Sequence, residues 1–328
     1  MRAKLSILGL IVIQACTAGA ELSVQVVGEA PFVELRIMDG DTPVFLPLNR
    51  SALDFVSPTL EVQLPISEVS SDGAVVTITH SLLDVHTITQ RFTKLGPNLI
   101  QRDVSVTGSS DLRYAIDMGW KAAQEGPFHS FTGAEAESAH YTPSCSGPEF
   151  GGGSHQTFPF LGYRHGETLY GIIGDTPGHW ENRSFLHFDT AKRSLHLANG
   201  DGSAKRVITI PRELDATTVY RAEFDGWQHI EAGETQMFIS WLFASPAKTQ
   251  YEVQLAAHIA LANAKGWNSS ALEAILRNTS YILLRRNMLR PESDHIFISG
   301  VGYGWKQWVT DGFYMSRGLD DPIYDAAA

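Results

Sequence analysis

The sequence predicts a mainly β protein with α-helix towards its C-terminus, built on a large antiparallel β-sandwich. From Leu22 to about Ser240 it is a long succession of segments rich in β-branched and aromatic residues. Turn residues separate these segments, and no helical pattern alternates with them. After Pro246 the apolar residues change to helical spacing. Many antiparallel strands in this rhythm are typical of a sandwich.

The expected strands follow from alternation and β-branched content. They include Ser23–Val27, Phe32–Ile37, Ala74–Thr79, Val85–Phe92, Leu169–Gly174, Leu195–Leu197 and Arg206–Ile210. The clearest hairpin pairs Thr87–Phe92 with Leu99–Val106 through the turn Lys94–Asn98, which contains Gly, Pro and Asn. Thr218–Phe224 and Gln236–Phe243 are expected to form the closing hairpin of the sandwich.

The segment from Glu125 to Gly178 interrupts the strands with Gly, Pro, Ser and His, which is typical of a functional or mobile loop. Its four histidines and the one that follows it match no metal-ligand spacing, so no metal site is predicted there. They are His129, His140, His155, His165 and His179. Trp180 is a candidate for a loop that stacks on a sugar or faces another domain. Cys145 is the only cysteine besides Cys16, so we expect neither a disulfide nor a catalytic thiol.

Two helices are predicted after Pro246. The first carries an apolar stripe and ends at Gly266; its stripe is Val253, Ala256, Ala257, Ala260, Leu261 and Ala264. The second begins with the capping box Ser270–Glu273 and stops before Pro291. Arginines in its last turns complement the helix dipole.

The stretch from Ser293 to Leu319 reads as a strand, a glycine turn and a helix. At helical spacing, its apolar face is Trp305, Trp308, Val309, Gly312 and Phe313. Asp311 lies beside Trp308 at the edge of this face. Indole rings stack on the C–H face of a pyranose and a carboxylate accepts its hydroxyl hydrogen bonds, so the pattern indicates a sugar site. The alternative is an ordinary buried amphipathic helix whose aspartate caps or pairs with a neighbour.

Tyr303-Gly304-Trp305 followed by Trp308-Val309-Thr310-Asp311 resembles the first barrel helix of the six-hairpin (α/α)6 glycoside hydrolases, the glucoamylase-like clan. Many members carry Trp-x-Arg-Asp there, and Thr310 stands in place of the arginine. The resemblance implies a supersandwich, linker helices and then a catalytic barrel. It implies substrate binding by Asp311, Trp308, Trp305 and Tyr303, with the catalytic carboxylates beyond residue 328, so we expect the chain to be the front part of a longer enzyme.

The first residues have the pattern of a secretory signal. Arg2 and Lys4 form a basic start, Leu5–Ile13 an apolar core, and Ala18–Ala20 a small-residue cleavage site. The alternative is a lipoprotein whose Cys16 is lipidated. The expected divisions are a signal peptide (1–20), a β-sandwich domain (21–245), a helical linker (246–292) and the start of the barrel (293–328).

The net charge and the sequence motifs limit the classes of binding partner. A net charge of -11 disfavours nucleic acid and anionic membranes. The glycines around Tyr303 do not complete a nucleotide-binding loop, and no apolar run after the signal reaches the roughly 18 residues of a membrane span. We therefore predict a carbohydrate partner and no cofactor. Three functions stay open: part of a secreted or periplasmic glycoside hydrolase, a non-catalytic carbohydrate-binding or structural sandwich, and a mutarotase-like enzyme acting on the sandwich itself.

Overall fold

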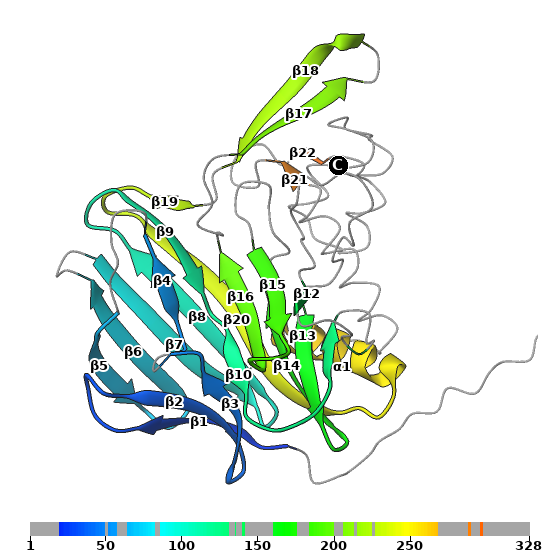
Figure 1. Cartoon of the computed structure of the whole chain (residues 1–328). Coiled ribbons are helices and arrows are strands. Elements are labelled where there is room, and N and C mark those ends of the chain that lie inside the picture. Colours follow the sequence, from blue (N-terminus) through cyan, green and yellow to red (C-terminus); the bar gives the residue numbers. More distant parts are fainter. Residues whose placement is uncertain are drawn as a thin grey trace, which may run out of the picture.

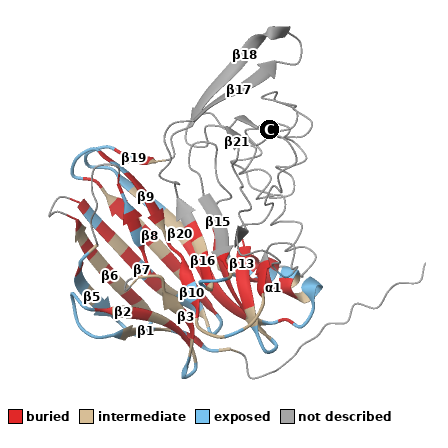
Figure 2. Cartoon of the chain, viewed as in Figure 1, coloured by how far each residue is buried: buried red, intermediate tan, exposed pale blue. Residues whose placement is uncertain are grey.

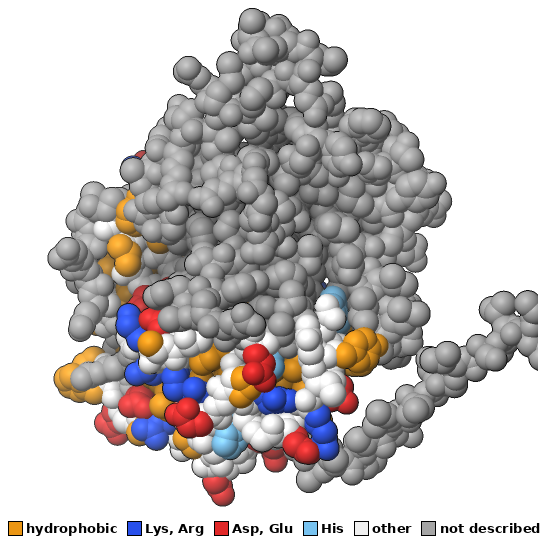
Figure 3. Space-filling view, turned by 45° about the vertical axis from the view of Figure 1, so that its right-hand side comes forward, with side chains coloured by type: hydrophobic (Ala, Val, Ile, Leu, Met, Phe, Trp, Pro, Cys, Tyr) orange, Lys and Arg blue, Asp and Glu red, His pale blue; other side chains and the backbone are white. Residues whose placement is uncertain are grey.

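The computed structural model describes the greater part of the first 267 residues and two short strands after them. The described ranges are 20–49, 52–57, 64–82, 86–130, 135, 140–141, 160–175, 184–199, 206–212, 215–224, 227–267, 288–289 and 296–297. Within these ranges, no helix has the length and apolar character needed to cross a membrane. On the face shown in Figure 3, acidic and basic side chains are interspersed over the described surface.

Two large antiparallel sheets make up most of the described structure, which confirms the predicted β-sandwich (Figure 1). The eight-stranded sheet has the order β11-β13-β14-β20-β8-β7-β6-β5. Its strands are β5 (Ile66–Ser71), β6 (Val75–Leu82), β7 (His86–Gly96), β8 (Leu99–Thr107), β11 (Phe128–Ser130), β13 (Phe160–His165), β14 (Thr168–Gly174) and β20 (Thr235–Pro246).

The ten-stranded sheet follows the path β1-β2-β3-β10-β16-β15-β12. Strand β9 joins this path by pairing with β16, and β4 and β19 pair with β9. Its strands are β1 (Leu22–Val27), β2 (Glu34–Asp39), β3 (Thr42–Pro47), β4 (Asp54–Val56), β9 (Leu112–Asp117), β10 (Trp120–Ala122), β12 (His140–Tyr141), β15 (Ser184–Asp189), β16 (Ser194–Asn199) and β19 (Gln228–Ile230). Two separate pairs are β17 (Arg206–Arg212) with β18 (Asp215–Phe224), and β21 (Met288–Leu289) with β22 (Ile296–Phe297).

The main core lies between the two large sheets (Figure 2). Strand β6 illustrates how a strand contributes to this core. Its residues alternate between buried and half-buried along its whole length. Successive side chains of a strand point to opposite faces, so this alternation places one face inside the sandwich. Ile78 of β6, Val104 of β8 and Leu195 of β16 are fully buried members of that core.

A polar chain crosses this apolar core. The guanidinium of Arg102, which is fully buried, donates to the carbonyl oxygens of Met118 and Ala52, each at 2.7 Å, and to Oε1 of Gln90 at 2.6 Å. The amide Nε2 of Gln90 lies 2.8 Å from Nε2 of His80, which therefore accepts the hydrogen bond. Burial of the guanidinium without such partners would cost several kcal/mol, so these hydrogen bonds allow the Arg102 cation to lie inside the sandwich.

Helix α1 (Gln250–Ala264) covers the outer face of the eight-stranded sheet. Val253, Ala257 and Leu261 pack in a second core with Trp241 and Phe243 of β20. This confirms the predicted stripe. The helix begins with a capping box in which Thr249 accepts from the Glu252 amide at 3.2 Å, while the Glu252 carboxylate accepts from the Thr249 amide at 3.0 Å.

The C-terminal end of α1 is fixed to the sheet by a cation. The ammonium group of Lys265 forms an ion pair with Asp175 and lies 4.8 Å from the ring centroid of Trp241. The sheet next to α1 is closely packed at Gly171 of β14, which lies opposite Phe243 of β20 in the sheet register. A Cβ at Gly171 would come within 2.3 Å of the Phe243 ring, so only glycine fits there without rearrangement.

The first strand is anchored through Glu21 and Asp39. The backbone amide of Glu21 donates to Oδ1 of Asp39 at 2.8 Å, and the hydroxyl of Tyr170 donates to Oδ2 of the same carboxylate, also at 2.8 Å. The carboxylate of Glu21 lies 3.3 Å from the ammonium of Lys94. The chain therefore enters the sandwich beside a carboxylate that is itself held from the opposite sheet.

One expected hairpin is confirmed and another is wrong. Strands β7 and β8 form the predicted hairpin, with Thr87 opposite Thr107. The closing hairpin does not exist, because β18 pairs with β17, whereas β20 lies between β14 and β8. Strand β20 is apolar enough on both faces to take a central position, between the main core and α1, so it pairs with distant strands rather than with the preceding one. Residues 270–287 of the expected second helix and all of the expected barrel helix lie outside the described residues. The end of that second helix is wrong, because Met288–Leu289 form strand β21, which pairs with β22 within the strand expected after Ser293.

Candidate functional site

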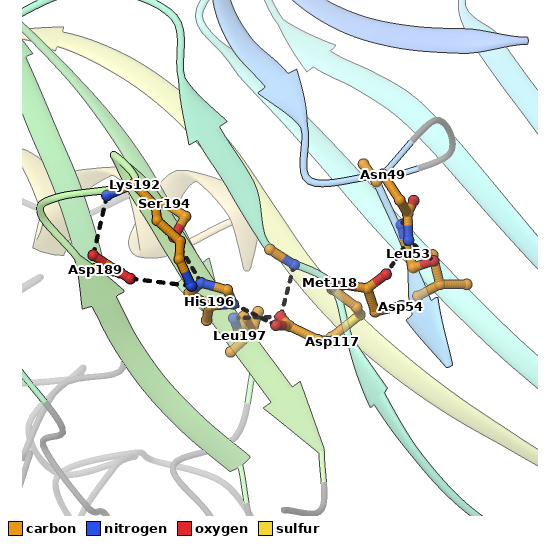
Figure 4. Close-up of polar contacts among 12 residues, drawn as sticks. Asn49, Leu53, Asp54, Asp117, Met118, Asp189, Lys192, Ser194, His196 and Leu197 are labelled. Atoms are coloured by element: carbon orange, nitrogen blue, oxygen red, sulfur yellow. Dashed lines mark hydrogen bonds and ion pairs between the residues drawn. The ribbon is translucent and has the colours of Figure 1, made fainter. Parts of the chain in front are cut away.

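The clearest polar cluster of the described structure lies on the outer face of the ten-stranded sheet, where β9, β10 and β16 meet (Figure 4). Strands β9 and β10 are consecutive in the chain and both pair with β16, through Asp117 opposite Ala198 and Trp120 opposite Leu195. Between them the chain turns at Gly119, where a Cβ would lie 2.4 Å from the Leu195 carbonyl oxygen. The junction therefore requires glycine.

One carboxylate oxygen of Asp117 stabilises the turn between β9 and β10. Its Oδ1 accepts from the backbone amides of Gly119 at 2.9 Å and Leu197 at 3.1 Å. These bonds tie the turn to the neighbouring strand. The second oxygen, Oδ2, remains available to a side chain, and it lies 2.5 Å from Nδ1 of His196.

His196 carries the contact on to Ser194. The other ring nitrogen, Nε2, lies 2.8 Å from Oγ of Ser194. Ser194 and His196 are two positions apart on β16 and so share a face, while Leu195 and Leu197 between and after them belong to the core. The side chains of His196 and Asp117 are 19% and 18% exposed, and Ser194 is 2% exposed. The result is a linear hydrogen-bonded chain of carboxylate, imidazole and hydroxyl.

Two further aspartates border this chain. Asp54 of β4 stands opposite Asp117 in the register and accepts a hydrogen bond from the side chain of Asn49. Desolvation raises the pKa of Asp54, and the charge of Asp117 raises it further; the bond from Asn49 and the nearby His196 act in the opposite direction.

Asp189, which borders Ser194 on the other side, has a structural role. Its Oδ1 accepts from the amides of Ala191 and Lys192, each at 3.0 Å, and the ammonium of Lys192 lies 3.6 Å from Oδ2. Side-chain acceptors of this kind stabilise turns, here the turn between β15 and β16. This turn fixes the start of β16 and therefore the position of Ser194.

The chemistry of the cluster follows from which atoms are engaged. Both ring nitrogens of His196 contact protein groups, Nδ1 with Asp117 and Nε2 with Ser194. The hydroxyl of Ser194 ends the row of hydrogen bonds, and the residue is only 2% exposed. A mutarotase-like site would bring a histidine pair to face a glutamate, whereas this cluster contains one histidine and no glutamate.

None of the sugar-site residues predicted from the sequence can be placed: Tyr303, Trp305, Trp308 and Asp311 lie outside the described residues, as do Cys145, His155, His179 and Trp180. His129 is buried in β11, and a ring nitrogen of His165 lies 2.9 Å from the Glu125 carbonyl oxygen. In the ranges that the structure describes, no group of three or more His, Cys, Asp or Glu side chains could hold a metal ion.

Sequence reasoning missed Asp117, Ser194 and His196. The only local signal is a Ser-x-His pair at alternate positions of an expected strand, which puts both side chains on one face. Asp117 is 79 positions from His196, and no pattern in the sequence connects them. The pairing of β9 with β16 brings them together.

No family model matches the chain, and no curated protein matches it. Among solved structures, a polysaccharide lyase aligns with a TM-score of 0.41 and 8% identity over 74% of this chain and 35% of its own. A protein of Escherichia coli K12 described as an aldose 1-epimerase aligns with a TM-score of 0.35 and 10% identity, covering 69% of this chain and 99% of its own. A galactose mutarotase-like protein of Clostridium acetobutylicum gives 0.32 and 7%, covering 70% and 100%. At such low scores and identities these similarities assign neither a family nor an activity.

Proposed function

We propose that the chain is the sandwich-bearing part of an exported glycoside hydrolase that cleaves oligo- or polysaccharide between two carboxyl groups acting as acid and base. The observation that carries the proposal is the order of elements along the chain. A two-sheet sandwich ends with β20 at Pro246, and the capped helix α1 starts at Gln250. The aromatic and acidic stretch from Tyr303 to Asp311 follows.

Sugar binding is the part of the function that this chain itself supplies. Trp308 offers an apolar face on which a pyranose ring stacks, and Asp311 beside it accepts hydroxyl hydrogen bonds. Each charge-assisted bond contributes about 1.5 to 3 kcal/mol. Asp311 acts here as a sugar ligand and not as the proton donor.

Export is the second part of the proposal. Signal peptidase cleaves after Ala20, and the mature protein begins at Glu21, immediately before β1. Intact-mass measurement of the protein recovered outside the cytoplasm tests this. Retention of Met1, or a diacylglyceryl mass on Cys16, contradicts it.

The hydrolase proposal is tested with Asp311→Asn in the complete gene product, assayed on a panel of oligosaccharides for reducing-sugar release. Loss of two charge-assisted bonds in the transition state is expected to lower kcat/KM by about 10²- to 10⁴-fold. Thermal unfolding should be unchanged. Asp41→Asn removes an equal charge from an exposed turn between β2 and β3 and serves as the control.

The outcomes separate the alternatives. Unchanged activity of Asp311→Asn means that the aspartate is no sugar ligand, and unfolding of the variant supports the capping or core-pairing interpretation. Titration of the parent with oligosaccharides adds a second measurement. Binding without any release of reducing sugar favours a non-catalytic carbohydrate-binding sandwich.

A further inference from the structure

We propose that Ser194, His196 and Asp117 form a nucleophilic triad that hydrolyses small carboxylic esters, with Ser194 Oγ as the nucleophile. The connectivity carries the proposal. Oγ of Ser194 lies 2.8 Å from Nε2 of His196, and Nδ1 of the same ring lies 2.5 Å from Oδ2 of Asp117 (Figure 4). A serine, a base and a group that orients the base are the parts that such catalysis requires, in this order.

The carboxylate fixes the protonation of the ring. Oδ1 of Asp117 accepts two backbone N–H groups, so the side chain is held as an acceptor. Oδ2 therefore accepts the hydrogen of Nδ1, and Nε2 carries the lone pair. The hydroxyl of Ser194 must then donate to Nε2. This is the tautomer in which the imidazole can remove the serine proton.

The sheet holds the three side chains in place before any substrate arrives. Ser194 and His196 lie on one face of β16, and Asp117 ends β9, which pairs directly with β16. Gly119 lets the chain pass close to Leu195, and Asp189 secures the turn that precedes Ser194. Catalytic groups on rigid elements keep their geometry better than groups on loops.

The reaction balances without any cofactor. Oγ of Ser194 forms a bond to the carbonyl carbon of the ester while its proton moves to Nε2 of His196. The alcohol leaves with that proton, and an acyl-serine remains. Water then attacks the acyl group, gives its proton to His196, and the carboxylic acid departs as Ser194 recovers its hydrogen. Because Ser194 is only 2% exposed, the structure favours a short acyl group such as acetyl.

This activity is independent of the glycosidic function proposed above, since it uses none of Tyr303, Trp305, Trp308 and Asp311. The two can therefore fail separately. An alternative for the same three residues is a purely structural one, in which they only fasten β9, β10 and β16 together. The experiment must therefore follow a bond to Ser194 and not stability alone.

The test treats the folded chain with 4-nitrophenyl acetate, follows release of nitrophenolate, and maps the acetyl group by peptide mass after acid quenching. The expected result is acetylation of Ser194 in the parent protein. Ser194→Ala and His196→Gln should each slow nitrophenolate release by about 10²-fold or more, the usual contribution of a positioned base. Ser67→Ala, which removes an exposed hydroxyl bonded to the Thr79 carbonyl, should change nothing.

The pH dependence provides a second readout that a structural role would not produce. Acetylation of Ser194 should slow on acidification, since only a neutral base can accept the serine proton. Acetyl groups found only on lysines or on the N-terminal amine of the parent overturn the proposal. So does release of nitrophenolate that is equally fast in folded Ser194→Ala. If the variants unfold, the mapping on the parent decides.

Discussion

The imidazole of His80 shows how one buried residue sets the response of the fold to acid. Its Nε2 accepts from Gln90, whose other amide atom accepts from Arg102. Desolvation lowers the pKa of His80 to about 4, and the charge of Arg102 lowers it as well, although the carbonyl groups of Pro65 and Leu64 act in the opposite direction. A proton on Nε2 would also face the N–H of Gln90, so the native state excludes it.

The free energy of unfolding should therefore fall as the pH drops from about 6.5 towards 4. In this range His80 binds a proton in the unfolded chain but not in the folded chain. Above pH 6.5 this contribution is constant. The shift corresponds to about 3 kcal/mol at its full extent. Urea unfolding at a series of pH values measures it. His80→Gln should flatten part of the slope, and His258, whose pKa burial also lowers to about 4, retains the rest. A parent with equal stability at pH 4 and 7 contradicts this account.

At the scale of the element, the N-terminal capping box stabilises the first turn of α1. Thr249 and Glu252 satisfy each other's backbone amides. Thr249→Ala removes one acceptor from the first turn and should cost about 1 kcal/mol of unfolding free energy. The control is Gln254→Ala on the exposed side of the same helix, which should be neutral or slightly stabilising, since alanine has the higher helix propensity. A cost equal for both variants would show that the cap contributes nothing.

At the scale of the whole molecule, local signals were readable from the sequence and long-range pairing was not. The β7–β8 hairpin followed from a turn of Gly, Pro and Asn between two alternating segments. The stripe of α1 followed from its spacing. The place of β20 between β14 and β8 did not, because both of its faces are apolar and neither identifies a partner. The contact of Asp117 with His196 could not be predicted for the same reason, since it depends on the pairing of β9 with β16. The assignment of Asp311 stays a prediction.

If the leader is removed after Ala20, as proposed, the contact between Glu21 and Asp39 makes that cleavage a change of charge at the surface of the sandwich. In the uncleaved chain a neutral amide donates to Oδ1 of Asp39. Cleavage after Ala20 would replace that amide with an α-ammonium group at the same carboxylate. A surface pair of this kind adds up to about 1 kcal/mol.

The protein that begins at Glu21 should accordingly unfold at a higher temperature than one that keeps Gly19 and Ala20 in front of it. The difference should shrink in high salt, and above about pH 8, where the amine loses its proton. Asp39→Asn should abolish the difference, and equal melting temperatures of the two forms at neutral pH would contradict it. Removal of the leader would then act as a one-way electrostatic latch, because an irreversible cleavage would add an ion pair that the longer chain cannot form.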